Sequence, residues 1–133
     1  MTFYIDSKKA DSPRRISALL KKCILCHPEK WTEIVFLCVG TDRTTGDCLG
    51  PYIGQQLLSH AIQGIYVYGT LFQPVHALNL RGACDDIRRR HPEALVIAID
   101  ASLGQKKHLG YVTIANGALY PGAAVRKELP PVG

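Results

Sequence analysis

The stretch VFLCVGTDRTTGDCLGPYIG, Val35–Gly54, joins a continuous apolar run to a helix through a polar loop. An uninterrupted apolar run of this length is typical of a strand buried on both faces of a parallel sheet. The loop begins at Gly40, and the following helix is expected from Pro51 to about His60. A glycine-rich loop between a strand and a helix usually binds phosphate, but this loop carries carboxylates, among them Asp47. The stretch therefore predicts a βα unit whose loop carries two carboxylates, Asp42 and Asp47.

Hydrophobic patterning in the rest of the chain predicts an α/β fold. Ser12 followed by Pro13 predicts the N-cap and first turn of a helix. Further expected elements are strands at 33–40, 64–70, 94–100 and 111–115 and a helix within 76–91. This alternation predicts right-handed crossovers and a mostly parallel sheet between two helical layers, a three-layer αβα arrangement. We expect a single domain, in which a basic N-terminal arm and helix (residues 1–33) pack on an α/β body (residues 34–133).

The composition excludes several protein classes. The chain has 133 residues, of which 47% are hydrophobic and 20% are charged, as in ordinary globular domains. No apolar run approaches the roughly 20 residues of a membrane helix, and the N-terminus has no apolar signal core. We therefore expect a cytoplasmic protein with no membrane partner.

The net charge of +5 comes from the N-terminal part of the chain. Residues 1–30 contain seven Lys or Arg residues and three acids, whereas the rest contains nine and eight. This basic helix is predicted either to contact nucleic acid or another acidic partner weakly, or to be a solvated surface. No aromatic residues are interleaved with the cations, as a surface for stacking bases would require.

Five cysteines in a chain of this type do not predict a disulfide framework. Four of them lie in apolar patterns and are expected to be small core residues: Cys23, Cys26, Cys38 and Cys84. The segment CILCH matches a haem-attachment pattern, but the only methionine is Met1 and no second Cys or His pair could complete a zinc site. We expect no metal and no cofactor. Cys48 stands apart because it follows Asp47.

The loop that begins at Gly40 does not match a P-loop. Five residues separate Gly40 from Gly46, and the next residue is Asp47, where a P-loop has a lysine. A carboxylate at that position repels a phosphate group. Phosphate binding through backbone N–H groups alone stays open as an alternative.

Two carboxylates are expected at the carboxyl edge of the sheet. Asp47 follows the strand at 33–40, and Asp100 ends the apolar strand at 94–100. Ligands of open α/β sheets bind at this edge, and two converging carboxylates can share a proton and activate water. The alternative is that Asp47 caps the next helix and Asp100 caps a turn. Spacing alone does not separate these two interpretations.

Two polar residues and one turn complete the candidates. His76 could reach the same crevice, although a packed or capping histidine is the usual alternative. Asn79 lies off the apolar stripe of the helix expected there. The turn at Pro121–Gly122 could bring backbone N–H groups near a substrate, or be a plain turn. We assign substrate binding to Thr41, Asp42, His76 and Asn79.

Four segments resemble the YyaC family of sporulation proteins, relatives of the germination protease of spore-forming bacteria. They are CVGTDRTTGDCLGP, VYGTLFQPVHALNL, VIAIDASLG and YPGAAVRKELPPVG. The resemblance covers about residues 34–133. It implies the phosphorylase/hydrolase-like αβα fold shared with hydrogenase maturation peptidases. It also implies a location in the forespore or mother cell and a protein or peptide substrate.

The resemblance also assigns catalytic roles. The segment GDCLGP matches a catalytic segment of the germination protease, so one catalytic aspartate would be Asp47. The second, at a strand end matching VIAIDA, would be Asp100. Hydrogenase maturation peptidases bind nickel partly through an acid near the VYGT stretch. This chain has Val67 and Tyr68 there, so no nickel site is expected.

Relatives continue beyond the LPPVG segment, so we expect this chain to be C-terminally truncated, either by nature or as a fragment. The function expected is aspartate-dependent peptide hydrolysis in sporulation, with Asp100 activating water and Asp47 polarising the scissile carbonyl. The alternative is a catalytically inactive interaction domain acting in sporulation. A fold can outlive its chemistry, and the sequence predicts neither the substrate nor the oligomeric state.

Overall fold

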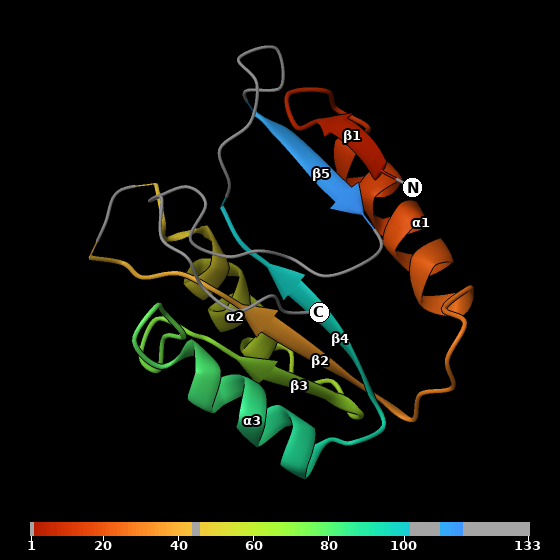
Figure 1. The fold of residues 1–133 in the computed structure, drawn as a ribbon. Coiled ribbons are helices and arrows are strands. Elements are labelled where there is room, and N and C mark those ends of the chain that lie inside the picture. Colours follow the sequence, from red (N-terminus) through yellow and green to blue (C-terminus); the bar gives the residue numbers. More distant parts are fainter. Residues whose placement is uncertain (1, 44–45, 102–109, 116–133) are drawn as a thin grey trace. The chain divides into compact units, whose positions relative to one another are not determined.

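The structure is a computed structural model that describes residues 2–43, 46–101 and 110–115 of the chain (Figure 1). The elements in these ranges are β1 (Thr2–Asp6), α1 (Ser12–Leu25), β2 (Glu33–Cys38), α2 (Leu49–Ser59), β3 (Ile65–Tyr68), α3 (Leu80–Arg90), β4 (Ala94–Ile99) and β5 (Tyr111–Ala115). They belong to two compact units. Of the described elements, the first unit comprises β1, α1 and β5, and the second comprises β2, α2, β3, α3 and β4.

The first unit is a two-stranded antiparallel sheet packed on a helix. β1 pairs with β5 in a register that places Phe3 opposite Ile114 and Ile5 opposite Val112. Ile5 and Ile114 are buried, with exposed fractions of 1% and 8%. Because side chains alternate along a strand, Phe3 and Ile5 share one face of the sheet with the residues opposite them. α1 contacts both strands, and its half-buried positions recur at helical spacing.

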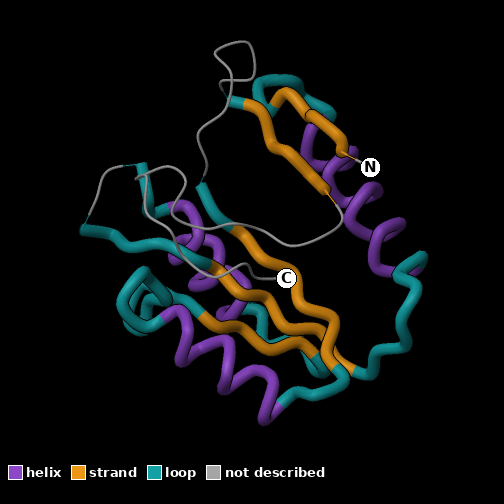
Figure 2. The backbone as a smooth tube through the Cα atoms, in the orientation of Figure 1, coloured by secondary structure: helices purple, strands orange, loops and turns teal. Residues whose placement is uncertain are grey.

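The second unit contains a parallel sheet with the strand order β3-β2-β4 (Figure 2). β2 lies in the centre, with Leu37 opposite Tyr68 of β3 and Cys38 opposite Ile99 of β4. A central strand is paired on both sides and covered on both faces, which explains why Val35, Leu37 and Cys38 are at most 1% exposed. The α/β class and the parallel sheet predicted from the apolar runs are confirmed.

Alternate residues of β2 contact different helices of the second unit. Val35 and Leu37, together with Val39 directly after β2, belong to a buried cluster with Leu80 and Ile87 of α3. Cys38, with the opposite parity, has its Cβ against Gly54 of α2 instead. α2 and α3 therefore contact opposite faces of this strand, as the period of two requires.

Several details differ from the sequence interpretation. β1 was not expected, and the strand predicted at 111–115 pairs with β1 in antiparallel fashion rather than in the parallel sheet. α1 begins at Ser12 itself, and its N-cap is Asp11. α3 begins only at Leu80, because the preceding residues form a hydrogen-bonded turn.

Other expectations meet the structure only in part. Cys26 is exposed, not a core residue, because it follows the last turn of α1. Cys38 is buried as expected, while Cys23 and Cys84 are partly buried. The turn at Pro121–Gly122 lies outside the described residues. The domain boundary near residue 33 stays a prediction. In the described ranges, no helix combines the length and apolar character needed to cross a bilayer.

Candidate active site

The loop after β2 folds back on the end of that strand. Gly40 has a φ of 148°, and its N–H donates to the carbonyl oxygen of Val75 at 2.8 Å. The N–H of Thr41 donates to the carbonyl oxygen of Asp47, also at 2.8 Å. A Cβ at residue 40 would lie 2.2 Å from that oxygen, so only glycine allows this approach. Asp47 is thereby held beside the carboxyl end of β2.

Asp100 directly follows the neighbouring strand, β4. The N–H of Val39 donates to the carbonyl oxygen of Ile99 at 2.8 Å, which continues the β2–β4 ladder to the strand ends. The backbones that carry Asp47 and Asp100 therefore emerge at the same edge of the sheet, from adjacent strands. Both residues are half-buried, and each interacts with other groups of the protein. We call Asp47 and Asp100 the acid pair, and their role as a catalytic pair stays a prediction.

Two glycines bring the start of α2 against this edge. A Cβ at Gly50 would lie 2.2 Å from the carbonyl oxygen of Val39, and a Cβ at Gly54 would lie 1.8 Å from that of Gly69. The helix can approach the strand ends this closely only because both positions lack a side chain. The N-cap of α2 is Cys48, so Asp47 precedes the cap position that one sequence interpretation gave it.

Thr41 and Asp42 lie in the loop between β2 and Asp47. The hydroxyl oxygen of Thr41 accepts a hydrogen bond from the N–H of Arg43 at 3.2 Å, which tightens the turn. Asp42 is exposed. Both residues are therefore close to Asp47 in sequence, and the exposed side chain of Asp42 is accessible to a ligand.

His76 and Asn79 belong to an ordered turn before α3. The Asn79 side chain accepts from the N–H of His76 at 2.7 Å and donates to the carbonyl oxygen of Pro74 at 2.9 Å. Nδ1 of His76 accepts from the N–H of Leu78 at 3.2 Å, which assigns the proton of the neutral ring to Nε2. This turn lies at the same edge of the sheet as the acid pair, because Val75 forms a parallel β-bridge with Val39, the residue that follows β2.

Thr70 also orders this connection, although sequence reasoning gave it no role. Its exposed fraction is 7%, its N–H donates to the carbonyl oxygen of Gln73, and its hydroxyl accepts from the N–H of Gln73 at 3.0 Å. The signal available in the sequence was a threonine directly after the glycine that ends a strand. Such a reciprocal turn holds the segment from Gly69 to Val75 in one conformation.

Cys48 and Cys38 are both close to Asp47 in sequence, but their environments differ. Cys48 is exposed and borders a groove of about 420 Å³ that runs along α2 past Tyr52 and Gln56. Neither Asp47 nor Asp100 lines this groove. Burial raises the pKa of the Cys38 thiol from 9.0 to about 12, so Cys38 is no nucleophile near neutral pH. Among the described residues, no three His, Cys, Asp or Glu side chains are grouped to hold a metal ion.

The comparisons with known proteins establish the family. The profile of a family described as "Protein of unknown function (DUF1256)" matches residues 4–133. The chain belongs to this family. It is also 42% identical over 130 residues to a Bacillus subtilis (strain 168) protein named "Uncharacterized protein YyaC". The alignment covers 98% of this chain and 62% of that relative, and it confirms the resemblance to YyaC. No solved structure matches the chain.

Proposed function

We propose that this DUF1256 protein is a peptide hydrolase that uses Asp47 and Asp100 and acts in sporulation, in the forespore or mother cell. One observation carries the proposal: the two aspartates follow adjacent parallel strands at one edge, with the Val39–Ile99 hydrogen bond joining the strand ends. The carboxyl edge of a parallel sheet is where α/β enzymes bind their ligands. The wider fold in this proposal is the three-layer, phosphorylase/hydrolase-like arrangement, and the location is cytoplasmic.

The roles follow from carboxyl chemistry. Two carboxyl groups in one site share a proton, because two adjacent negative charges repel each other. Asp100, as the ionised member, holds a water molecule and accepts its proton during attack on the peptide carbonyl carbon. Asp47, as the protonated member, donates a hydrogen bond to the carbonyl oxygen, where negative charge develops. Asp100 then gives this proton to the leaving amine nitrogen as the C–N bond breaks and the carbonyl re-forms, which restores the ionised Asp100 and the protonated Asp47 for the next cycle.

The predicted substrate-binding residues suit a peptide backbone. A peptide presents N–H donors and carbonyl acceptors in alternation. The exposed carboxylate of Asp42 accepts from an N–H, while Nε2–H of His76 donates to a carbonyl oxygen. Thr41 and Asn79 hold the two loops in shape through hydrogen bonds to backbone groups. In this proposal their mutation weakens substrate binding more than the chemical step.

The test uses a total protein extract from spores of Bacillus subtilis, with cleavage followed by mass spectrometry of newly formed peptide termini. The purified chain should produce cleavage that Asp100→Asn and Asp47→Asn each reduce at least about 100-fold, since neither amide can take part in proton exchange. Asp85→Asn is the matched control, because Asp85 is an exposed aspartate on α3 that forms an ion pair with Arg88, which is also exposed.

The outcomes separate hydrolysis from the alternative, an inactive interaction domain acting in sporulation. Equal cleavage by the wild type and both acid-pair variants contradicts the proposed chemistry. No cleavage by any variant, together with retention of a spore protein on the immobilised wild-type chain, supports the interaction domain. Circular dichroism on each variant separates lost chemistry from lost folding.

A further inference from the structure

The outer face of α1 gathers cations without acids. α1 spans Ser12–Leu25 and contains four charged residues, all basic. They are Arg14, Arg15, Lys21 and Lys22, and all four are exposed. Residues seven apart lie nearly above one another on a helix, so Arg14 aligns with Lys21 and Arg15 with Lys22. The four cations therefore form one surface, which we name the basic face.

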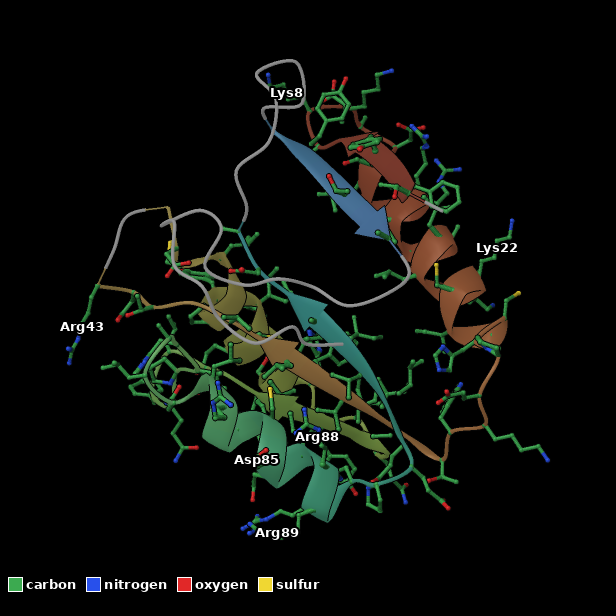
Figure 3. The ribbon with its side chains drawn as sticks, in the orientation of Figure 1. Lys8, Lys22, Arg43, Asp85, Arg88 and Arg89 are labelled. Carbon is green, nitrogen blue, oxygen red and sulfur yellow. The ribbon has the colours of Figure 1, made fainter. Side chains whose placement is uncertain are left out.

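The basic face is opposite the side of α1 that packs in the first unit. Ile16, Leu20 and Cys23 are half-buried and recur at the spacing of one helix face, whereas the cations occupy the other positions. α1 contacts β1 and β5. Figure 3 shows Lys22 extending from α1 on the side away from these two strands. Among the described residues, none of the four cations forms an ion pair.

The positions of two of these cations, Arg14 and Arg15, do not stabilise α1. Arg14 and Arg15 follow directly on the start of α1, where the helix dipole is positive and disfavours a cation. No acidic residue lies in that turn, and the side chain of Asp11 at the N-cap makes no capping hydrogen bond. The placement concentrates positive potential at the start of the helix. An anionic partner in contact with this face would relieve that repulsion.

The side chains on this face distinguish between classes of anionic partner. A membrane surface requires a helix whose apolar side is available for insertion, but the apolar side of α1 contacts β1 and β5. Protein interfaces need a core of large apolar or aromatic anchors. Between the cations lie only Ala18 and, at the end, Leu25. Single-stranded nucleic acid requires aromatic stacking platforms, and α1 contains no aromatic residue.

We propose that the basic face of α1 binds the phosphate backbone of double-stranded DNA without reading the base sequence. Seven residues of helix span about 10 Å, and successive phosphates of one strand are about 3.4 Å apart along the duplex axis. The arginine and lysine pairs therefore contact separate phosphates. B-form DNA accommodates a helix along its major groove, whereas the A-form major groove of RNA is too narrow. This activity is independent of the acid pair.

The test measures fluorescence anisotropy of labelled duplexes of about 20 base pairs and two unrelated sequences, with the full chain, between about 50 and 200 mM salt. Four phosphate contacts predict that log affinity falls against log salt with a slope of about −3 to −4. Arg14→Gln/Lys21→Gln should lower the affinity about tenfold and make the slope shallower by about 2. Glutamine keeps good helix propensity, so circular dichroism should show an unchanged fold.

The matched control is Arg88→Gln/Arg89→Gln, which removes the same charge from α3. These arginines are exposed but form ion pairs with Asp85 and Asp86, and Figure 3 labels both arginines on α3. The proposal requires that this control keep the wild-type slope and affinity within about twofold. Equal losses in both double variants would reduce the effect to net charge and overturn the proposal. Equal affinity for an RNA duplex, or binding to anionic lipid vesicles without DNA binding, would also overturn it.

Discussion

Gly54 of α2 and Gly69 after β3 approach so closely that a Cβ on Gly54 would lie 1.8 Å from the carbonyl oxygen of Gly69. Gly69 in turn has a φ of 95°, and a Cβ there would lie 1.9 Å from the carbonyl oxygen of Cys38. These contacts set the distance between α2 and the strand ends. The position of the loop that carries Asp47 depends on that distance, because the loop connects β2 to α2.

Gly54→Ala should therefore lower the free energy of unfolding, by about 1–3 kcal/mol, because the added methyl group forces α2 away from the strand ends. Gly82→Ala is the control. Gly82 is exposed in α3, and a Cβ added there would meet no atom within 4 Å. Alanine there should raise stability by up to about 1 kcal/mol through helix propensity. Urea denaturation measures both, and a Gly54→Ala variant as stable as the wild type would contradict the close packing.

Cysteine labelling should divide the thiols by environment. Cys38 is fully buried, and its pKa of about 12 makes its thiolate fraction near pH 8 about 10³-fold smaller than that of an ordinary thiol. Cys48 and Cys26 are exposed. Iodoacetamide at about pH 8 should label both quickly and Cys38 only after denaturation. Peptide mass spectrometry measures the order in which the cysteines are labelled. Early labelling of Cys38 would show that β2 is not the central strand of its sheet.

The His91–Glu33 contact should contribute measurably to stability. Nδ1 of His91 lies 2.8 Å from Oε1 of Glu33, and the two side chains are only 11% and 24% exposed. A double-mutant cycle with His91→Ala and Glu33→Ala should give a coupling energy of about 1 kcal/mol. The Asp85–Arg88 pair, with both side chains more than half exposed, should couple by less than about 0.5 kcal/mol. Equal coupling energies in the two cycles would contradict this ranking.

The Tyr68–Asp86 hydrogen bond, 3.1 Å long, should shape stability at both ends of the pH scale. Desolvation, the hydrogen bond and the nearby negative charge raise the pKa of Tyr68 above 10.0. Desolvation alone would raise the pKa of Asp86. The hydrogen bond from Tyr68 and the charges of Arg90 and Arg89 outweigh it, so that this pKa is lowered below 3.8.

The directions of the pKa shifts of Tyr68 and Asp86 determine the pH range in which each group stabilises the fold. A lowered carboxyl pKa stabilises the fold above about pH 3.8, and this stabilisation is lost as the pH falls through the folded value. A raised tyrosine pKa stabilises the fold below about pH 10, and this is lost as the pH rises. Tyr68→Phe should lower the melting temperature at about pH 7 and flatten the decline above about pH 10. Thermal unfolding scans from about pH 7 to above about pH 10 measure the melting temperature of the variant and the wild type. An equally steep alkaline decline in both proteins would contradict the role assigned to Tyr68.

Local sequence was enough to predict the parallel strands and the edge at which the acid pair lies. The run from Val35 to Val39 is apolar at every position, which is typical of a strand buried on both faces of a parallel sheet. Asp47 and Asp100 each follow such a run, and parallel strands end at the same edge. Both predictions rest on continuous apolar runs and on chain direction, which are properties of short segments.

Tertiary structure alone decided which strands are neighbours and how closely the elements approach. β4 pairs with β2 rather than with β3, so the strand that Asp100 follows is the direct neighbour of the strand that leads to Asp47. β1 pairs with β5 from the far end of the described chain, as in the pairing of Thr2 with Ala115, and no local pattern encodes such a contact. The Gly54–Gly69 approach is likewise invisible in sequence, because a glycine's role depends on what lies where its side chain would be.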